Sequence, residues 1–487
     1  MSIGLYTMAE LRAIEARAQA HLPPATLMQR AGRVAAECID ARYGAARAVL
    51  IVCGPGNNGG DGFACAQALA ARGHSVTCVA LAESATDDAR TARMAWQANG
   101  GRVLRELPED PRCDVVVDAL FGIGLGRPLS GRYFDAARWI GSRAAAVVAL
   151  DVPSGLDADR GVWVGGAAGV RADVTCTFLG AKPGLFTADG CDAAGEVVVD
   201  ALGVDLPDPS GNLTEPDQFA SLLARRPRNT HKGSFGNVAV VGGGVGMIGA
   251  PLLAARAALR LGAGRVYVDC IGAPQLRFDP AQPELMFRPL ASLGDVDAIV
   301  IGCGLGTDDA AAAALAAALE RSVPLVVDAD GLNLLADRSR FAGAFEAHAA
   351  GRVLTPHPLE AARLLGASAN EVQADRVAAA RALARQSASI VVLKGAGTVV
   401  AHPAGRWWIN PTGGPALATA GTGDVLAGMI GAFIAQGIEP IQAALAAAWL
   451  HGRAADEFGG DVGLVAGDVA AGAARALVRL RRQGTQP

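Results

Sequence analysis

Asp424 lies where a glycine-rich loop meets an apolar helix, within residues 410–428 (NPTGGPALATAGTGDVLAG). Because Gly421, Thr422 and Gly423 lack bulky side chains, their backbone N–H groups can approach a phosphate at the positive end of that helix. An aspartate here would repel the anion that the amides attract, so it is better suited to accept a proton from a substrate hydroxyl. The alternative is an ordinary helix N-cap, a position that Asp favours, and one residue can serve both purposes.

A second group of candidates lies in the N-terminal half, where three polar or glycine-rich loops follow apolar strand patterns: residues 57–61, 118–128 and 151–155. In a parallel sheet the carboxyl ends of the strands form the usual ligand-binding edge. Asn58, Asp118 and Ser154 can present oxygens there, which are hard ligands suited to K⁺ or Mg²⁺ rather than zinc. Each loop alone is equally well explained as a glycine turn with an Asx cap, but three at strand ends favour a site.

The C-terminal half offers further candidates at strand ends. Lys394 stands between a strand and two glycines, which suits a nucleotide phosphate, although a lysine at a turn is usually only solvated. His357 lies between two prolines that fix its backbone, so it is placed either for substrate or for a local hydrogen bond. Asp328 and Asp330 are oxygen donors for Mg²⁺, but a turn built on Asp-Gly explains them slightly better.

The elements that must position these residues alternate strand with helix. Thr7 and Glu10 predict a capping box that begins a helix, and a second helix follows over 24–42. Apolar strand patterns occur at residues 49–54, 75–81, 113–120, 146–152, 171–179, 195–201, 238–241, 265–270, 298–301, 324–327, 352–354 and 390–393. A Pro/Gly/Asp-rich segment at 206–216 has no apolar period. The pattern predicts two α/β domains with parallel sheets, residues 1–212 and 213–487.

Composition narrows the function further. The chain has 487 residues, 51% of them hydrophobic and 62 of them glycine, which suits an α/β enzyme with many tight turns and excludes disorder as the main state. A net charge of −4 gives no footprint for nucleic acid, and no stretch reaches the roughly 20 apolar residues of a membrane span. Nine scattered cysteines in mostly apolar runs are typical of free thiols in a reducing compartment, without zinc spacing. We expect a cytoplasmic protein with no nucleic-acid or membrane partner.

Five motifs together resemble one family over nearly the whole chain, the bifunctional NAD(P)H-hydrate repair enzymes, in which an epimerase domain is fused to an ADP- or ATP-dependent dehydratase. Residues 54–62 (GPGNNGGDG) and 151–155 (DVPSG) resemble the epimerase signatures. Residues 355–358 (TPHP), 394–398 (KGAGT) and 420–426 (AGTGDVL) resemble those of the dehydratase. The resemblance implies a Rossmann-like first domain and a ribokinase-like second domain.

Carried over by position, the resemblance assigns residues to four roles. The epimerase substrate would contact Asn57, Asn58, Gly59, Gly60, Asp61, Gly122, Ile123, Gly124, Leu125, Gly126, Arg127, Pro128 and Asp151. K⁺ would be held by Asn58, Asp118 and Ser154. The dehydratase substrate would contact Ala250, Gly304, His357 and Asp424. The adenine nucleotide would contact Lys394, Gly395, Ala396, Gly397, Thr398 and Gly423.

The substrates implied are the hydrated cofactors NADHX and NADPHX, which carry a hydroxyl on the reduced nicotinamide ring. Hydroxide is a poor leaving group, so Asp424 would take the hydroxyl proton while ADP or ATP with Mg²⁺ supplies a phosphoryl group, and loss of phosphate would restore the ring. Family members dehydrate one epimer, the S form, and the epimerase makes both forms repairable. Asp151 is expected to be the proton-transfer group of the epimerase. We also expect a homo-oligomer.

Several positions depart from the family pattern. Leu359 replaces a glycine, and Gly414, Ala416 and Leu417 replace Asn, Gly and Met, which bears on the pocket's shape and on nucleotide preference. Two other functions remain open: the second domain as a kinase for a small hydroxylated metabolite, or the first domain as a binding module without catalysis.

Overall fold

The computed structural model describes residues 3–45, 47–109, 112–142 and 145–483. The chain divides into two compact units, Ile3–Gly211 and a second that begins at Asn212. Both are built on sheets of mainly parallel strands with helices on both faces, so the predicted α/β class is confirmed. None of the helices in the described part of the chain is long and apolar enough to cross a membrane.

The N-terminal unit contains a sheet in the order β4-β3-β2-β5-β6-β7-β8, with every neighbouring pair parallel. Its strands are β2 (Ala48–Cys53), β3 (Ser75–Ala80), β4 (Arg102–Leu104), β5 (Val115–Ala119), β6 (Ala146–Leu150), β7 (Val174–Phe178) and β8 (Glu196–Asp200). The central strands read as runs of Val, Ile and Leu because both of their faces are buried. Their parallel register brings the carboxyl ends of β2, β5 and β6 to one edge, where the predicted loops lie.

Helices cover this sheet on both faces. The helices are α1 (Met8–Gln19), α2 (Thr26–Tyr43), α3 (Asn57–Ala71), α4 (Asp87–Ala98) and α5 (Arg132–Gly141). Residues of α1, α2 and α3 pack in one core cluster, and α5 packs in the cluster on the opposite face. The predicted capping box is present: Thr7 Oγ1 accepts from the backbone of Glu10, and the Glu10 carboxylate accepts from the backbone of Thr7.

The prediction that residues 57–61 form a loop is wrong, because they form the first turn of α3. The glycines there permit close packing rather than an unusual backbone. A Cβ on Gly59 would lie 1.9 Å from the carbonyl oxygen of Gly54, and one on Gly60 would lie 2.4 Å from Met28. Only glycine lets the helix start this close to the strand end.

The C-terminal unit contains strands in the order β18-β17-β16-β15-β14-β13-β10-β11-β12. Every neighbouring pair from β16 to β12 in this order is parallel, whereas the pairs β16–β17 and β17–β18 are antiparallel. Their bounds are β10 (Asn237–Gly242), β11 (Arg265–Cys270), β12 (Met286–Phe287), β13 (Ala298–Ile301), β14 (Leu325–Val327), β15 (Arg352–Leu354), β16 (Ile390–Leu393), β17 (Val399–Ala401) and β18 (Trp407–Ile409).

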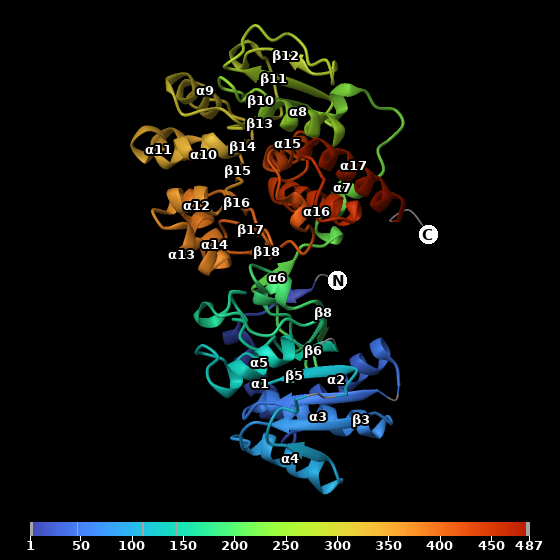
Figure 1. The fold of residues 1–487 in the computed structure, drawn as a ribbon. Helices are drawn as coiled ribbons and strands as arrows, with labels where there is room; N and C mark the ends of the chain where they lie inside the picture. Colours follow the sequence, from blue (N-terminus) through green and yellow to red (C-terminus); the bar gives the residue numbers. More distant parts are fainter. Residues whose placement is uncertain (1–2, 46, 110–111, 143–144, 484–487) are drawn as a thin grey trace. The chain divides into compact units, whose positions relative to one another are not determined.

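Figure 1 shows two helical layers on this second sheet. One contains α8 (Gly249–Arg260), α15 (Thr422–Ala435), α16 (Pro440–Phe458) and α17 (Ala466–Gln483). The other contains α9 (Asp309–Leu319), α10 (Ala329–Ala336), α11 (Arg338–Ala347), α12 (Pro358–Leu365), α13 (Ala369–Ala374) and α14 (Arg376–Ser387).

Helix α15 is buried almost all round, which is why its sequence is apolar on every face. Gly428 lets it lie directly on α8, because a Cβ there would approach the carbonyl oxygen of Ala254 to 2.0 Å. Gly431 does the same against Val300 on β13. The packing therefore fixes the N-terminus of α15, which carries Asp424.

Candidate active sites

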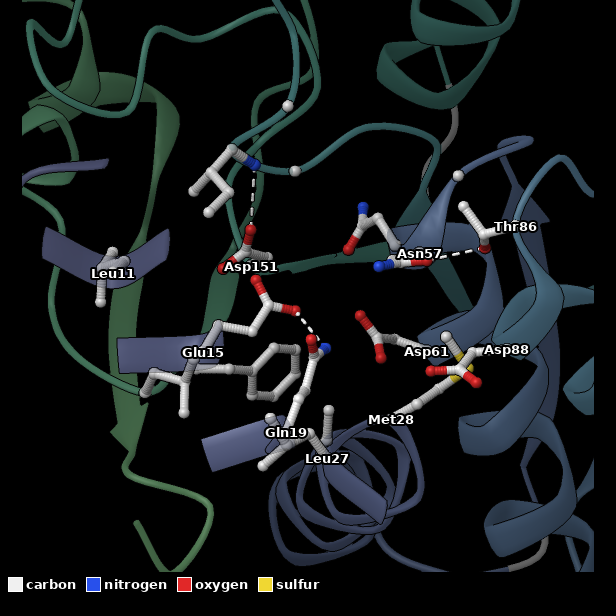
Figure 2. Close-up of a pocket in the computed structure, with 18 of the residues that line it drawn as sticks. Leu11, Glu15, Gln19, Leu27, Met28, Asn57, Asp61, Thr86, Asp88 and Asp151 are labelled. Atoms are coloured by element: carbon white, nitrogen blue, oxygen red, sulfur yellow. Dashed lines mark hydrogen bonds between the residues drawn. The ribbon is translucent and has the colours of Figure 1, made fainter. Parts of the chain in front are cut away.

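The N-terminal unit has a pocket of about 690 Å³ at the carboxyl ends of β2, β5 and β6. Figure 2 shows its side chains converging from α1, α2, α3 and the loops. Of the residues predicted to bind substrate, those that line it are Asn57, Asn58, Asp61, Gly122, Ile123, Gly124, Leu125 and Asp151. The lining does not include Gly59, Gly60, Gly126, Arg127 or Pro128.

Asp151 is held rigidly at the pocket wall. Its backbone adopts a left-handed conformation with φ of +67°, which is uncommon for a residue with a Cβ. One carboxylate oxygen lies 2.6 Å from the Lys182 ammonium, and the other accepts the Ile123 N–H at 3.0 Å. Lys182 is fully buried and also donates to the carbonyl oxygen of Phe178 at 2.7 Å. The Lys182 contact and the Ile123 N–H fix the position of the Asp151 carboxyl group in the pocket.

Two more carboxyl groups, Glu15 and Asp61, face the same space in Figure 2. Burial raises the pKa of Asp61 well above its ordinary value, with the charges of Asp151 and Glu15 adding to the effect. Burial also raises the pKa of Glu15, followed by the charge of Asp151. The pocket thus contains carboxyl groups with different tendencies to hold a proton, an arrangement typical of acid–base sites.

The predicted K⁺ ligands Asn58, Asp118 and Ser154 are all buried, and Asn58 also lines the pocket. Asp118 accepts the Ser154 hydroxyl at 2.7 Å and the Ser154 N–H at 2.8 Å, and burial raises its pKa to about 6. The amide oxygen and nitrogen of Asn58 are buried without a hydrogen-bond partner among the residues that the structure describes. Oxygen donors with one orphaned amide fit a monovalent cation, because a buried polar group normally has a partner.

In the C-terminal unit, one ligand atom each of Cys303, Asp328 and Asp424 lies within 4.8 Å of the others. Burial, and then the charge of Asp328, raises the pKa of Asp424 to about 6, while the Cys303 thiol hydrogen bond and Lys394 oppose the rise. A buried carboxylate with a raised pKa is the form of base that can take a proton near neutral pH. Asp424 sits in the first turn of α15 as predicted.

The alternative that Asp424 is the helix N-cap is wrong. The N-cap is Gly421, whose φ of +88° lies in the left-handed region, and no side chain caps the helix there. The first-turn amides of α15 therefore have no capping side chain, which suits an anion at this end.

Lys394 begins the turn of residues 394–398, which is predicted to contact the nucleotide, and it connects this turn to the cluster of Cys303, Asp328 and Asp424. Its ammonium lies 2.6 Å from a carboxylate oxygen of buried Asp328, and a Cβ on Gly423 would lie 3.2 Å from it. The guanidinium of buried Arg376 supports the start of this turn, because it donates to the carbonyl oxygens of Leu393 and Lys394, both at 3.2 Å. The glycines at 395 and 397 adopt positive φ, so the turn needs them. Lysine, first-turn amides and carboxylates are thereby brought together.

The remaining predicted residues divide around this centre. A Cβ on Gly304 would lie 3.1 Å from the Ala250 Cβ, so these two are neighbours beside Cys303. His357 is exposed and is the N-cap of α12, where its Nδ1 accepts the Leu359 N–H at 3.1 Å. The local hydrogen bond weighed for His357 therefore exists, and Nε2 lies 3.3 Å from the carboxylate of buried Glu360.

Asp330 serves its own turn, because it accepts from the N–H of Gly306 at 2.9 Å and from the Asn333 side chain at 3.3 Å. This favours the structural reading of Asp330 over a Mg²⁺ ligand.

Sequence reasoning missed Lys182, Glu15, Cys303 and Arg376. Each lies outside a recognised motif or among apolar neighbours, and each becomes significant only through partners distant in the chain. Lys182 alone carried a signal, since a lysine within an apolar stretch at a strand end calls for a buried partner.

Comparison with known proteins gives two family matches. Residues 24–184 match the family described as YjeF-related protein N-terminus, and residues 238–477 match the family described as NAD(P)H-hydrate dehydratase. A bifunctional NAD(P)H-hydrate repair enzyme of Coxiella burnetii is 38% identical over 485 residues, covering 96% of this chain and 97% of that protein. The Escherichia coli enzyme of the same name is 38% identical over 88% of this chain and 84% of its own length.

Among solved structures, the chain is similar to an ADP/ATP-dependent NAD(P)H-hydrate dehydratase from Bacillus subtilis crystallised with ATP and Mg²⁺. The two are 32% identical with a TM-score of 0.50, over 55% of this chain and 98% of that one. This likeness agrees with the ribokinase-like fold expected for the second domain.

Proposed function

The chain belongs to the family of bifunctional NAD(P)H-hydrate repair enzymes, and from this premise we propose that it restores hydrated NADH and NADPH through two separate reactions. Residues 1–212 form the epimerase domain, which interconverts the R and S hydrates. Residues 213–487 form the dehydratase domain, which returns the S hydrate to NADH or NADPH at the expense of ADP or ATP. The observation that carries this proposal is the grouping of Asp424, Asp328 and Lys394 at an uncapped helix N-terminus.

The dehydratase site supplies what a phosphorylation followed by elimination requires. Asp424 removes the proton of the substrate hydroxyl, and the oxygen attacks the terminal phosphorus of the nucleotide. The backbone N–H groups of residues 421–423 and the Lys394 ammonium stabilise the charge on the transferring phosphoryl group. The lone pair of the ring nitrogen then expels inorganic phosphate as a C=N bond forms. Loss of a proton from the adjacent ring carbon forms the C=C bond and returns the C=N electron pair to nitrogen.

Mg²⁺ that binds with the nucleotide would neutralise phosphate charge during this transfer. The carboxylate of Asp328 is a hard oxygen donor that fits such an ion, whereas the Cys303 sulfur does not, since burial keeps its pKa well above the ordinary value and the thiol protonated.

In the epimerase domain, we assign proton transfer to Asp151 and substrate binding to the residues predicted for it that line the pocket. Asn58, Asp118 and Ser154 would hold K⁺, which would supply a fixed positive charge. The orphaned amide of Asn58 supports this assignment.

Incubation of the protein with NADH hydrate and ADP, and separately with ATP, tests the proposal. Recovery of the absorbance of reduced nicotinamide is the expected result. Consumption of nucleotide without that recovery would instead support a kinase for a small hydroxylated metabolite. An Asp151→Ala variant that interconverts the epimers as fast as the wild type would support a non-catalytic first domain.

We further propose a cytoplasmic homo-oligomer. The free cysteines include Cys38, Cys53, Cys65, Cys78, Cys176, Cys270 and Cys303, which suits a reducing compartment. Light scattering on the purified protein measures its mass, and a monomer would exclude the oligomer.

A further inference from the structure

Helix α1 forms one wall of the epimerase pocket. Leu11, Glu15 and Gln19 follow one another at intervals of four residues, so they share one helical face, and all three line the pocket. Ile14 is buried in the core and holds the helix against the sheet. The N–H of Met8 donates to the Asp159 carboxylate at 2.7 Å, which fixes the start of the helix. Glu15 is therefore presented to the pocket by a rigid element.

The carboxyl group of Glu15 lies among chemically active neighbours. Figure 2 shows it beside Asp151 and facing the same space as Asp61. The Gln19 side-chain amide donates to it at 3.2 Å and orients it. The Lys182 ammonium forms its ion pair with Asp151.

The two carboxyl groups have different surroundings. Burial raises the pKa of Glu15 and the charge of Asp151 raises it further, while Lys182 and Arg12 oppose the rise. Asp61, on α3, also faces this space, and its pKa is also raised. Asp88, on α4, is a further acidic residue of the lining. Asp151 carries the charge that Lys182 balances. Glu15 thus tends to keep a proton beside the carboxyl group that pairs with Lys182.

Epimerisation of the hydrate needs two such groups. Water adds to an enamine with its hydroxyl on the carbon bonded to nitrogen, because the nitrogen lone pair stabilises positive charge there. To invert this carbon, the lone pair forms a C=N bond, the C–O bond breaks, and an acid gives the departing oxygen its proton, so that water leaves. Water then adds to the opposite face, the C=N electron pair returns to nitrogen, and a base takes the surplus proton. One water leaves and one water adds, so the inversion consumes no further reactant.

We propose that Glu15 is a second proton-transfer group of the epimerase, the acid that protonates the departing hydroxyl, and that Asp151 is the base that receives the proton when water adds. The reverse conversion uses the pair in the opposite order. This inference rests on the proposed epimerase function. Glu15 precedes residue 24, the first residue that the N-terminal family model matches.

Glu15→Gln tests the role, because it preserves the shape and the contact with Gln19 but cannot release a proton. The two epimers of NADH hydrate are separated by chromatography in the absence of nucleotide, and the uncatalysed rate is subtracted. The kcat of epimerisation is expected to fall by about 10²-fold or more with little change in KM. The wild-type rate should decline as pH rises and Glu15 ionises, and this alkaline decline should be absent from the variant. Glu15→Asp should recover part of the rate.

Glu37→Gln is the matched control, since Glu37 lies on α2, is 53% exposed and pairs with Arg72 at 3.0 Å. It should epimerise like the wild type. A Glu15→Gln variant with the wild-type kcat and pH profile would overturn the proposal, and loss of the alkaline decline in Asp61→Asn alone would assign the acid to Asp61. A raised KM without rescue by Glu15→Asp would show a structural role and also overturn it. Failure of the wild type to interconvert the epimers would refute the epimerase function itself.

Discussion

Asp424→Asn should make the second domain more stable and nearly inactive. The substitution keeps the size of the side chain and an acceptor for the Cys303 thiol, while it removes the negative charge and the ability to take a proton. Asp424 is partly buried beside Asp328. The loss of surrounding water and the negative charge of Asp328 both disfavour its ionised form. Function requires that charge, but folding does not.

The magnitude follows from the pKa. Raising the pKa of Asp424 from 3.8 to about 6 corresponds to ~3 kcal/mol between the two protonation states. Partial solvent access reduces this to ~1–2 kcal/mol. Since the folded pKa is the higher one, the penalty is absent below pH 4, grows as the unfolded chain ionises, and is complete above pH 6. At neutral pH the neutral Asn should therefore raise Tm by ~2–6 °C.

The assay has two measurements on the same preparation. Calorimetry at about pH 7.5 and about pH 4 compares the Tm of the variant with that of the wild type. The gain in Tm should shrink at the lower pH. Turnover of S-NADH hydrate with ADP should fall by about 10²–10⁴-fold, the range for loss of a general base, while nucleotide affinity stays close to wild type.

Asp330→Asn is the control, because the structure occupies that carboxylate with the N–H of Gly306 and the side chain of Asn333. It should lose stability rather than gain it. An Asp424→Asn variant that turns over normally, or one that is less stable at neutral pH than at acidic pH relative to wild type, would refute the reasoning.

Three further perturbations test neighbouring contacts. Lys394→Met leaves the buried Asp328 charge unpaired, so it should cost ~3–5 kcal/mol by denaturant titration and weaken nucleotide binding, and adding Asp328→Asn should restore the stability. Asn58→Ala should abolish a K⁺-specific rise in the Tm of the first domain, measured against Li⁺; an unchanged K⁺ response would exclude Asn58 as a ligand. Cys303→Ala should move the acidic limb of the dehydration rate to higher pH, because the thiol hydrogen bond lowers the pKa of Asp424, whereas Cys303→Ser should keep the wild-type limb.

Much of the fold could be predicted because it depends on local pattern. Apolar runs of strand length that alternate with helices predict parallel sheets, and the capping box at Thr7 is a feature of neighbouring residues. Where a local signal has two explanations, the sequence was less reliable. Residues 57–61 look like a loop because glycines favour turns, yet here the glycines permit helix packing. Asp424 resembles an N-cap, but Gly421 takes that position.

The sequence by itself predicted two α/β domains and motifs at strand ends, and it proposed Asp424 and Asp151 as reactive groups. The domains, the motifs and Asp424 follow from residue types at fixed spacing along the chain, whereas Asp151 follows from the resemblance to a family. The tertiary structure alone decided that Lys182 neutralises Asp151, that Glu15 enters the epimerase pocket and that Cys303 contacts Asp424. The partners in these contacts lie tens of residues or more apart, and their approach is set by strand order, register and helix packing, which no short stretch of sequence encodes.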